Sequence, residues 1–346
     1  MRKKLITILI VLVVLLGAGL IAYAILWPGL EEKMEANREL AKENYEAAGN
    51  TTGVTQDGSM SYDAEKWQEG TITYNGKNYK YNANVKAYLF LGIDSDDPVS
   101  AAPDYVSGGQ SDAIFLLVDD PDNKKFSVVA VHRNTMTEIE IFDETGKSLG
   151  KQEGQICLQH GYGDGMKISC RLSEEAVSHL FYNIPISGYM SIQMGAIGYM
   201  NDAVGGVEVQ VLDDLTDTGR GVNLVKGTTV KLTADEAYVY LRSRDNDEFD
   251  SSSTRLERQK QWLTQFFNQV KIATSTQWNT MFDNLDPYIV YNFSFASLAS
   301  SVADYSMEMY TVKGETVLGS DGFEEHYIDD DDLYDLIINL FYKEVE

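Results

Sequence analysis

The sequence predicts an α/β fold, in which a central mixed β-sheet is flanked by helices in one large domain that follows an N-terminal transmembrane helix. Short apolar runs, typical of buried strands, alternate with segments typical of helices from residue 85 onward. Hydrophobic residues make up 44% of the 346 residues, which is enough for a large core. No repeat or linker interrupts residues 85–346, so we expect these residues to form a single extracellular domain.

The first 27 residues indicate a membrane anchor. Residues 1–4 carry three cations, and residues 5–27 carry no charge and are long enough to cross a hydrocarbon core of about 30 Å. The cations before this span and the acidic residues after it place residues 1–4 in the cytoplasm and the domain outside the cell. The alternative is a cleaved signal peptide, because residues 22–24 have the small-x-small form of a cleavage site. The length of the span and Trp27 at its end favour a retained single-pass anchor in the cell membrane.

Residues 28–69 are expected to form a stalk and linker. Residues 30–48 are rich in Glu, Lys, Ala and Asn without a clear apolar stripe, and a stretch rich in Gly, Thr and Ser follows. A β-hairpin is predicted over residues 70–84, because side-chain character alternates around Asn75-Gly76, a pair that favours a tight hairpin turn.

The elements of the main domain follow in order. Buried strands are predicted at residues 86–94, 111–119 and 126–131. Helices are predicted at residues 173–182, 234–241, 254–271 and 329–342, with a strand that leads into a helix at 292–299. In the last helix, an acidic first turn complements the helix dipole.

Charge and cysteine content exclude two classes of site. The net charge of −25 and the pI near 4.4 leave no basic surface for phosphates of nucleic acids, so no nucleic-acid partner is expected. Cys157 and Cys170 are the only cysteines, and neither has a Cys or His partner at zinc-finger spacing. Both fall in the extracellular part, where a disulfide could persist, and the sequence leaves open whether they pair.

A cluster of cations stands out in this acidic chain. Arg242, Arg244, Arg255 and Arg258 fall within seventeen positions. They can converge if the first two end one element and the last two share a face of the next helix. Arginine binds phosphate oxygens in two-point fashion, so the cluster predicts a pocket for a pyrophosphate or a similar dianion. The alternative is surface ion pairing with the acidic residues at 245–250, in which each pair contributes little.

Two aspartates, Asp94 and Asp112, lie at edges of predicted strands. Carboxylates there could hold Mg²⁺, which takes one or two protein carboxylates and completes its shell with water and phosphate oxygens. Alternatively each aspartate caps a turn, which is the commoner role of a lone aspartate at a strand edge.

Together these segments resemble the LytR-CpsA-Psr family of Gram-positive and related bacteria. The resemblance covers roughly residues 85–345, and the Arg-Ser-Arg to Arg-x-x-Arg-Gln block is its most specific part. The matching segments are residues 89–94 (LFLGID), 111–112 (SD), 131–135 (VHRNT), 203–207 (AVGGV), 226–227 (KG), 235–244 (DEAYVYLRSR) and 255–259 (RLERQ).

The resemblance implies a phosphotransferase that moves a glycopolymer from a polyprenyl-pyrophosphate carrier to peptidoglycan outside the membrane. Phosphoryl transfer depends mainly on positioning and charge neutralisation, which arginines and a bridging metal supply. The residues implied to bind the pyrophosphate are Arg133, Arg242, Arg244, Arg255, Arg258 and Gln259. The residues implied to be catalytic are Asp94, Asp112, Arg133 and Arg244, with both aspartates holding Mg²⁺, or Mn²⁺, or acting on the acceptor hydroxyl. An apolar tunnel for the lipid is expected along residues 180–186 and 189–200.

Three positions depart from the family pattern. Gln110 stands where the family usually has Arg, Asn134 stands where it has Asp, and residues 155–165 lack the usual Lys-Ile-Asn opening. His160 or Asp164 could supply a replacement group, although lone residues in a Gly-rich turn are more often structural. The first hypothesis is a divergent working enzyme, and the second is a non-catalytic scaffold or sensor that binds a polyprenyl phosphate or cell-wall polymer. A third, an adhesion or structural module, leaves the arginines unexplained.

Overall fold

The structure, a computed structural model, describes residues 71–346 except 246–247, 295–297, 299–300 and 321. The predicted cytoplasmic tail, membrane span and stalk, residues 1–69, lie outside the described residues. Within the described part of the chain, no helix is both long enough and apolar enough to cross a membrane.

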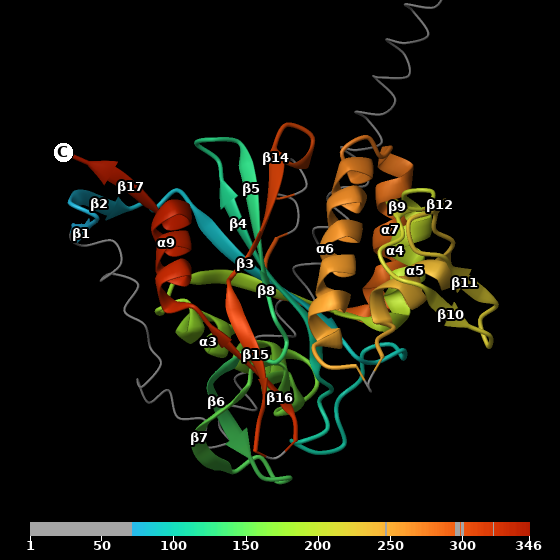
Figure 1. Cartoon of the computed structure of the whole chain (residues 1–346), viewed down its shortest axis with the longest axis horizontal. Coiled ribbons are helices and arrows are strands. Elements are labelled where there is room, and N and C mark those ends of the chain that lie inside the picture. Colours follow the sequence, from blue (N-terminus) through green and yellow to red (C-terminus); the bar gives the residue numbers. More distant parts are fainter. Residues whose placement is uncertain (1–70, 246–247, 295–297, 299–300, 321) are drawn as a thin grey trace, which may run out of the picture.

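A six-stranded mixed sheet forms the centre of the molecule (Figure 1). Its strands are, in spatial order, β13 (Ile289–Tyr291), β8 (Ile186–Gln193), β3 (Lys86–Ile93), β4 (Ser111–Asp120), β5 (Lys125–Val131) and β14 (Ser306–Thr311). The pairs β3–β8 and β5–β14 are parallel, and the other neighbours are antiparallel. The sheet confirms the predicted mixed α/β fold and the three predicted buried strands.

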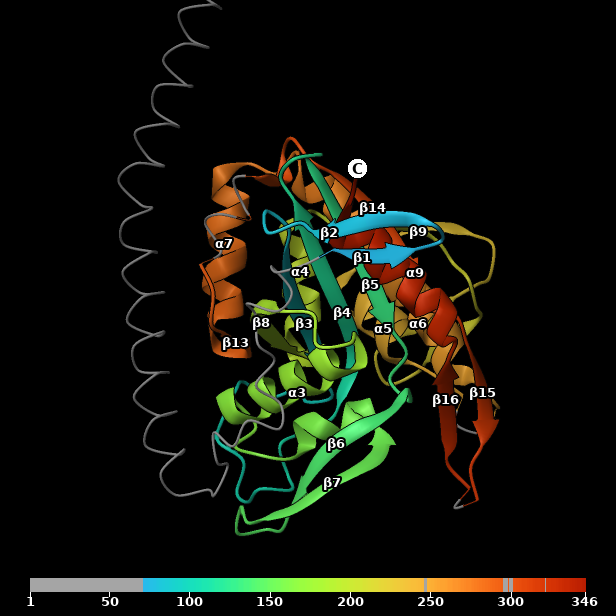
Figure 2. The same ribbon diagram turned by 90° about the vertical axis from the view of Figure 1, so that its left-hand side faces the viewer.

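Helices cover both faces of this sheet (Figures 1 and 2). Leu89 and Leu91 of β3 pack in the largest core cluster with residues of α3 (Lys167–Leu180) and α9 (Asp330–Phe341). Phe90, between them, points to the opposite face, where α6 (Ser251–Val270) packs. Because both faces are covered, the strands are apolar runs rather than alternating ones.

More helices and short ladders lie beside α6. The helices are α4 (Ile197–Ala203), α5 (Ala234–Arg242) and α7 (Ser275–Leu285), and the 3-10 turns are η2 (Met194–Ala196) and η3 (Asp286–Tyr288). The ladders pair β9 (Glu208–Gln210) with β12 (Thr229–Lys231) and β10 (Leu215–Asp217) with β11 (Val222–Leu224). A capping box of Thr233 and Glu236 fixes the start of α5. The predicted helices at 234–241 and 254–271 are thereby confirmed within a few residues.

The predicted N-terminal hairpin is confirmed and gains a third strand. β1 (Ile72–Tyr74) and β2 (Lys77–Tyr81) flank Asn75 and Gly76, whose φ angles of 48° and 76° suit a tight hairpin turn. β2 also pairs with β17 (Tyr342–Val345), which follows α9, so the two ends of the described chain meet in one small sheet (Figure 2). The predicted helix at 329–342 is confirmed as α9 with its acidic first turn, and Asp329 lies before it as a cap that accepts hydrogen bonds from two backbone N–H groups.

Two further hairpins were not predicted. β6 (Met136–Phe142) pairs with β7 (Ser148–Gln155), and β15 (Gly314–Leu318) pairs with β16 (Glu324–Ile328). The 3-10 turn η1 (Ile156–Gly161) follows β7. The β15–β16 hairpin contributes a residue to the site described below.

The helix predicted at 173–182 is wrong at its start. Oδ1 of Asp164 accepts hydrogen bonds from the backbone N–H groups of Met166, Ile168 and Ser169, so α3 begins at Lys167. Ser173 lies inside the helix, and its hydroxyl donates back to the carbonyl of Ser169. Asp164 is thus a cap.

Two other groups near η1 are also structural. His160 is buried, and its Nδ1 lies 3.0 Å from the carbonyl oxygen of Gly108. Cys157 and Cys170 are free thiols buried in the core, so the structure contains no disulfide between them.

Candidate functional site

The predicted acidic and basic residues meet at one edge of the central sheet. Asp94 follows the end of β3 and Asp112 lies near the start of β4, and these two strands are antiparallel neighbours. Arg133 follows β5, which is the next neighbour of β4. Oδ1 of Asp94 accepts the backbone N–H of Gln110 at 2.7 Å, which fixes the approach to β4. The strand order therefore brings together residues that are up to 39 positions apart, from 94 to 133.

Asp112 lies between two arginines. Its Oδ1 accepts from Nε of Arg133 and its Oδ2 accepts from Nη1 of Arg255, both at 2.8 Å. The Arg255 side chain is 4% exposed and that of Asp112 is 19% exposed, so the arginine is almost fully withdrawn from water and the carboxylate is mostly buried. Burial alone would raise the pKa of Asp112, but the charges of Arg255 and then Arg133 outweigh it and hold that pKa below its usual value. Asp112 is therefore a firmly ionised anchor for two cations.

Two of the three departures from the family pattern, Gln110 and Asn134, belong to the same network. Nη2 of Arg133 donates to Oε1 of Gln110, and its Nη1 donates to Oδ1 of Asn134 at 2.9 Å. Nδ2 of Asn134 in turn donates to Oε2 of Glu324 on β16 at 3.0 Å. Gln110 and Asn134 therefore fix the guanidinium of Arg133 through neutral acceptors.

Arg258 and Gln259 connect α6 to the end of α5. Arg258 is buried, with Nε donating to the carbonyl of Tyr240 at 2.8 Å and Nη2 donating to the carbonyl of Ser243. Its Nη1 pairs with Oδ2 of Asp213 at 2.6 Å. Nε2 of Gln259 donates to the carbonyl of Leu241 at 3.3 Å. Arg258 therefore fixes the end of α5 and the residues that follow it, the segment that carries Arg242 and Arg244.

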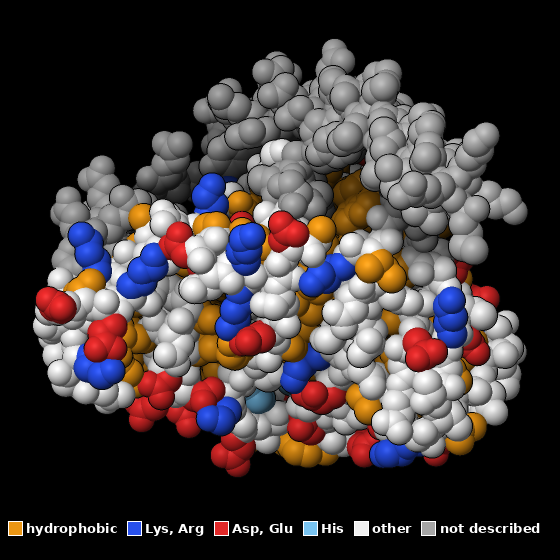
Figure 3. Space-filling view, turned by 90° about the horizontal axis from the view of Figure 1, so that it is seen from above, with side chains coloured by type: hydrophobic (Ala, Val, Ile, Leu, Met, Phe, Trp, Pro, Cys, Tyr) orange, Lys and Arg blue, Asp and Glu red, His pale blue; other side chains and the backbone are white. Residues whose placement is uncertain are grey.

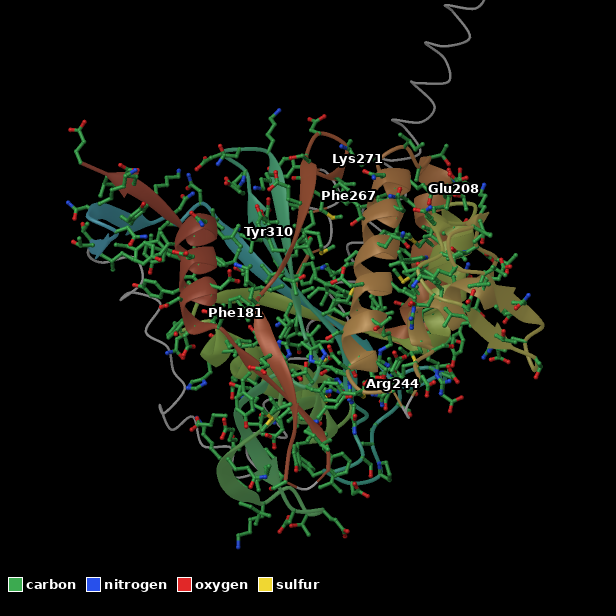
Figure 4. The ribbon with its side chains drawn as sticks, in the orientation of Figure 1. Phe181, Glu208, Arg244, Phe267, Lys271 and Tyr310 are labelled. Carbon is green, nitrogen blue, oxygen red and sulfur yellow. The ribbon has the colours of Figure 1, made fainter. Side chains whose placement is uncertain are left out.

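Arg242 and Arg244 project from that segment and are exposed. Arg242 lies 5.8 Å from the ring centre of Tyr238, and Nη1 of Arg244 donates to the hydroxyl of Ser252 at 3.2 Å. The charge of Arg244 also lowers the pKa of Asp112, so this cation lies within electrostatic reach of the buried cluster. In Figure 4, Arg244 lies near the N-terminal end of α6. The two exposed guanidinium groups are accessible to a phosphate.

An apolar cavity of about 310 Å³ runs from this cluster along α6. Its polar lining includes Asp112, Arg242, Arg255 and Gln259, and most of the rest is aliphatic and aromatic. The lining residues of α6 extend from Arg255 to Val270, a rise of about 22 Å in an α-helix. Figure 4 shows Phe267 toward the end of α6 opposite Arg244, and Figure 3 shows hydrophobic side chains near the middle of the face seen from above. The cavity therefore joins a cationic entrance to a long apolar interior.

The chain is similar in sequence and in fold to known proteins. The model of the LytR_cpsA_psr family matches residues 48–336. The chain belongs to the LytR_cpsA_psr family. A TagU protein of Enterococcus faecalis, named a polyisoprenyl-teichoic acid–peptidoglycan teichoic acid transferase, is 26% identical over 265 residues, which span 74% of this chain and 80% of that protein. A TagU of Bacillus anthracis is 33% identical over 139 residues, 40% of each chain.

Solved structures of similar fold include proteins of Bacillus subtilis. TagV has a TM-score of 0.58 at 20% identity over 75% of this chain and 96% of its own. A structure described as TagT bound to LI-WTA has a TM-score of 0.56 at 21% identity over 75% of this chain and 90% of that one. These likenesses show a shared fold.

Of the two stretches predicted to line an apolar tunnel in this LytR_cpsA_psr protein, only one lines the cavity. The stretch 189–200 contributes Met190, Ile192, Met194, Ile197 and Met200 to the cavity wall, as expected. The stretch 180–186 does not, because Phe181 and Ile184 pack into the core on the α3 side of the sheet. The remaining wall comes mainly from α6, α7 and the strands β3, β4 and β5, which no motif assigned to the tunnel.

A magnesium ion fits Asp94 better than Asp112. In the described part of the chain, no three His, Cys, Asp or Glu side chains cluster as metal ligands, but Mg²⁺ needs only one or two carboxylates. Partial burial raises the pKa of Asp94, and the charge of Asp112 adds to that rise, which a nearby divalent cation would counter. Both oxygens of Asp112 already accept hydrogen bonds from arginines. Asp112 could therefore bind a metal only through its remaining lone pairs.

Proposed function

We propose that this LytR_cpsA_psr protein transfers a glycopolymer from a polyprenyl-pyrophosphate carrier to peptidoglycan, forming a phosphodiester. The observation that carries the proposal is the cavity whose apolar interior ends at Arg242, Arg255 and Asp112. Such a shape suits a lipid with an anionic head. The names of the TagU relatives describe a transfer of this kind, from a polyisoprenyl carrier to peptidoglycan.

Each residue has a role in this proposal. Arg242 and Arg244, which are exposed at the entrance, bind the pyrophosphate, while the half-buried Arg133 and the buried Arg255 add positive potential from fixed positions. The acceptor hydroxyl attacks the phosphorus that bears the glycan and loses its proton to water, the bond from that phosphorus to the oxygen of the carrier phosphate breaks, and polyprenyl monophosphate leaves. Asp94, with the remaining lone pairs of Asp112, would hold Mg²⁺, which would neutralise part of the negative charge of the pyrophosphate. Asp112 also orients Arg133 and Arg255 for the same task.

The membrane location is part of the proposal. A lipid carrier stays in the bilayer, so the enzyme must work at the membrane surface. The uncharged residues 5–27 would anchor the chain there, with the domain outside the cell, where peptidoglycan lies.

The test uses the full chain in detergent with a polyprenyl-pyrophosphate sugar, with and without Mg²⁺. We expect release of polyprenyl monophosphate that requires the metal and is lost in Asp94→Ala. Tight binding of the carrier without release would contradict transfer and would favour the alternative, a carrier-binding scaffold or sensor.

A further inference from the structure

A second cavity lies on a different face of α6 from the apolar one. Its volume is about 330 Å³, at the lower end of the range of small-molecule sites. Its walls come from the first turns of α6, the segments after β5, β9 and β14, and strand β16. None of its lining residues also lines the apolar cavity.

His132 gives this cavity an unused hydrogen-bond donor. The side chain is buried, with a residue exposure of 5%, and burial lowers its pKa to about 3, so the ring is neutral. Nδ1 of His132 accepts the backbone N–H of Asn134 at 3.3 Å, which places the proton on Nε2. That buried N–H has no hydrogen-bond partner among the described residues, and the nearest carboxylate oxygen, of Asp250, is 3.9 Å away. A buried donor of this kind favours a ligand or water that accepts from it.

His326 gives the same cavity an acceptor. Its ring lies 4.4 Å from the ring of His132, centre to centre. The hydroxyl of Thr316 donates to Oδ1 of Asp250 at 3.0 Å, so it accepts from Nδ1–H of His326, also at 3.0 Å. This arrangement leaves the lone pair on Nε2 of His326. The two imidazoles, whose planes are tilted by 33° to each other, therefore offer one donor and one acceptor.

The charges around this cavity exclude an anionic ligand. Its lining contains no Lys or Arg but includes the carboxylates of Asp213 and Glu257. Asp213 is paired with Arg258, and Glu257 is paired with Lys260, so neither carboxylate is a free metal ligand. The cavity also carries the hydroxyl side chains of Ser253 and Thr254. A neutral molecule that both donates and accepts hydrogen bonds fits these walls best.

We propose that this cavity binds a neutral sugar residue of a glycan. The inference rests on the proposed function, in which two glycans reach the site: the one on the lipid carrier and the peptidoglycan acceptor. His132 directly precedes Arg133 in the chain, and Leu256 and Glu257 of the cavity wall lie between Arg255 and Arg258 on α6, so the cavity is built on the same elements as the arginine cluster. Sugar hydroxyls accept from Nε2–H of His132 and donate to Nε2 of His326 and to the carboxylates.

The test follows the four histidine rings of the full chain by ¹H–¹⁵N NMR during titration with a neutral N-acetylglucosamine disaccharide. His132 and His326 should shift in a saturable way. His160, which is buried elsewhere, and His179, which is exposed, are internal controls and should not move. Thr254→Trp, an exposed change at the cavity wall, should weaken binding at least about tenfold, whereas Gln265→Trp on the same helix should not.

Further titrations distinguish the source of the sugar and the type of ligand. A shift caused by the free disaccharide assigns the cavity to the acceptor, and one caused only by a carrier-linked sugar assigns it to the donor. The proposal is overturned if neither ligand moves His132, if Thr254→Trp binds normally, or if a sugar phosphate binds more tightly than the neutral sugar. Carrier cleavage is measured on the same samples. Missing shifts with intact cleavage therefore refute this inference alone, and clear shifts without cleavage refute the proposed function alone.

Discussion

Asn134 joins Arg133 to Glu324, with Oδ1 accepting from the arginine at 2.9 Å and Nδ2 donating to the glutamate at 3.0 Å. Only an amide can satisfy both partners, because an aspartate in this place would repel the carboxylate of Glu324. Oε1 of Glu324 also accepts the backbone N–H of Asp250 at 2.7 Å, so the same glutamate fixes the residue before α6. The amide at 134 and the carboxylate at 324 are therefore a matched pair.

Asn134→Asp should reduce activity, although it restores the family's usual residue. A second carboxylate repels Glu324 and loosens its hold on Asp250 at the start of α6, and we expect transfer to slow about tenfold and unfolding free energy to fall by roughly 1–3 kcal/mol. Adding Glu324→Gln removes the repulsion and should recover most of both losses. A double-mutant cycle measures this coupling, and simple additivity of the two changes would argue against a matched pair.

Asp112→Asn should be severely destabilising. It leaves Arg255, whose side chain is 4% exposed, without its counterion, at a cost of about 3–5 kcal/mol in unfolding free energy. Asp235→Asn is the matched control, because Asp235 pairs with Arg220 at the surface and its loss should cost less than about 1 kcal/mol. Urea denaturation measures both, and equal effects would mean that the buried pair is not as the structure places it.

Stability should fall in acid because three buried histidines, His132, His160 and His326, have lowered pKa values, and the shifts are large for His132 and His160. Burial lowers the pKa of His160 to about 4 and that of His132 to about 3, whereas both titrate near 6.5 when unfolded. Between those values the unfolded chain binds more protons, so the free energy of unfolding decreases as pH falls below about 6.5, by up to about 1.4 kcal/mol per pH unit per histidine. His160→Gln removes one of the titrating groups, so the free energy of unfolding should depend less steeply on pH. His179→Gln, at an exposed position, should leave this dependence unchanged. A slope that is the same in all three proteins would rule out the burial of a neutral His160.

The apolar cavity should discriminate carriers by chain length. Leu263→Trp enlarges a side chain of its wall, and we expect KM for a long polyprenyl carrier to rise about tenfold, with little change for a carrier of about ten carbons. Gln265→Trp, two residues further along α6 at an exposed position, serves as the control. An equal rise in KM for both carriers would place the lipid elsewhere.

The sequence was sufficient for the parts of this fold that depend on local pattern. Apolar runs located β3, β4 and β5, and Asn75-Gly76 located the first hairpin. It was insufficient where a partner lies far along the chain: Glu324 reaches Asn134 across 190 positions, and β17 reaches β2 from the other end of the domain. The early start of α3 was missed because Asp164 caps it from a Gly-rich turn that shows no helical pattern.

Motifs in the sequence picked out residues that meet at one edge of the sheet, but not the contacts among them, and their roles in the site stay predictions. Motifs named Asp94, Asp112 and the arginines, yet not that Arg255 would neutralise Asp112 while Arg258 would hold the end of α5. Arg255 and Arg258 make different contacts because of the angle at which α6 packs on the sheet. That angle cannot be predicted from the amino-acid composition.

The most direct measurement of the central claim follows a radiolabelled sugar phosphate from a polyprenyl-pyrophosphate carrier into peptidoglycan, using the full chain and its Arg244→Ala variant. Arg244 is exposed, so the variant should fold normally and lose at least about a hundredfold in transfer. We expect label in peptidoglycan in proportion to the polyprenyl monophosphate released. Release without label in peptidoglycan, or equal transfer by Arg244→Ala, would contradict the account.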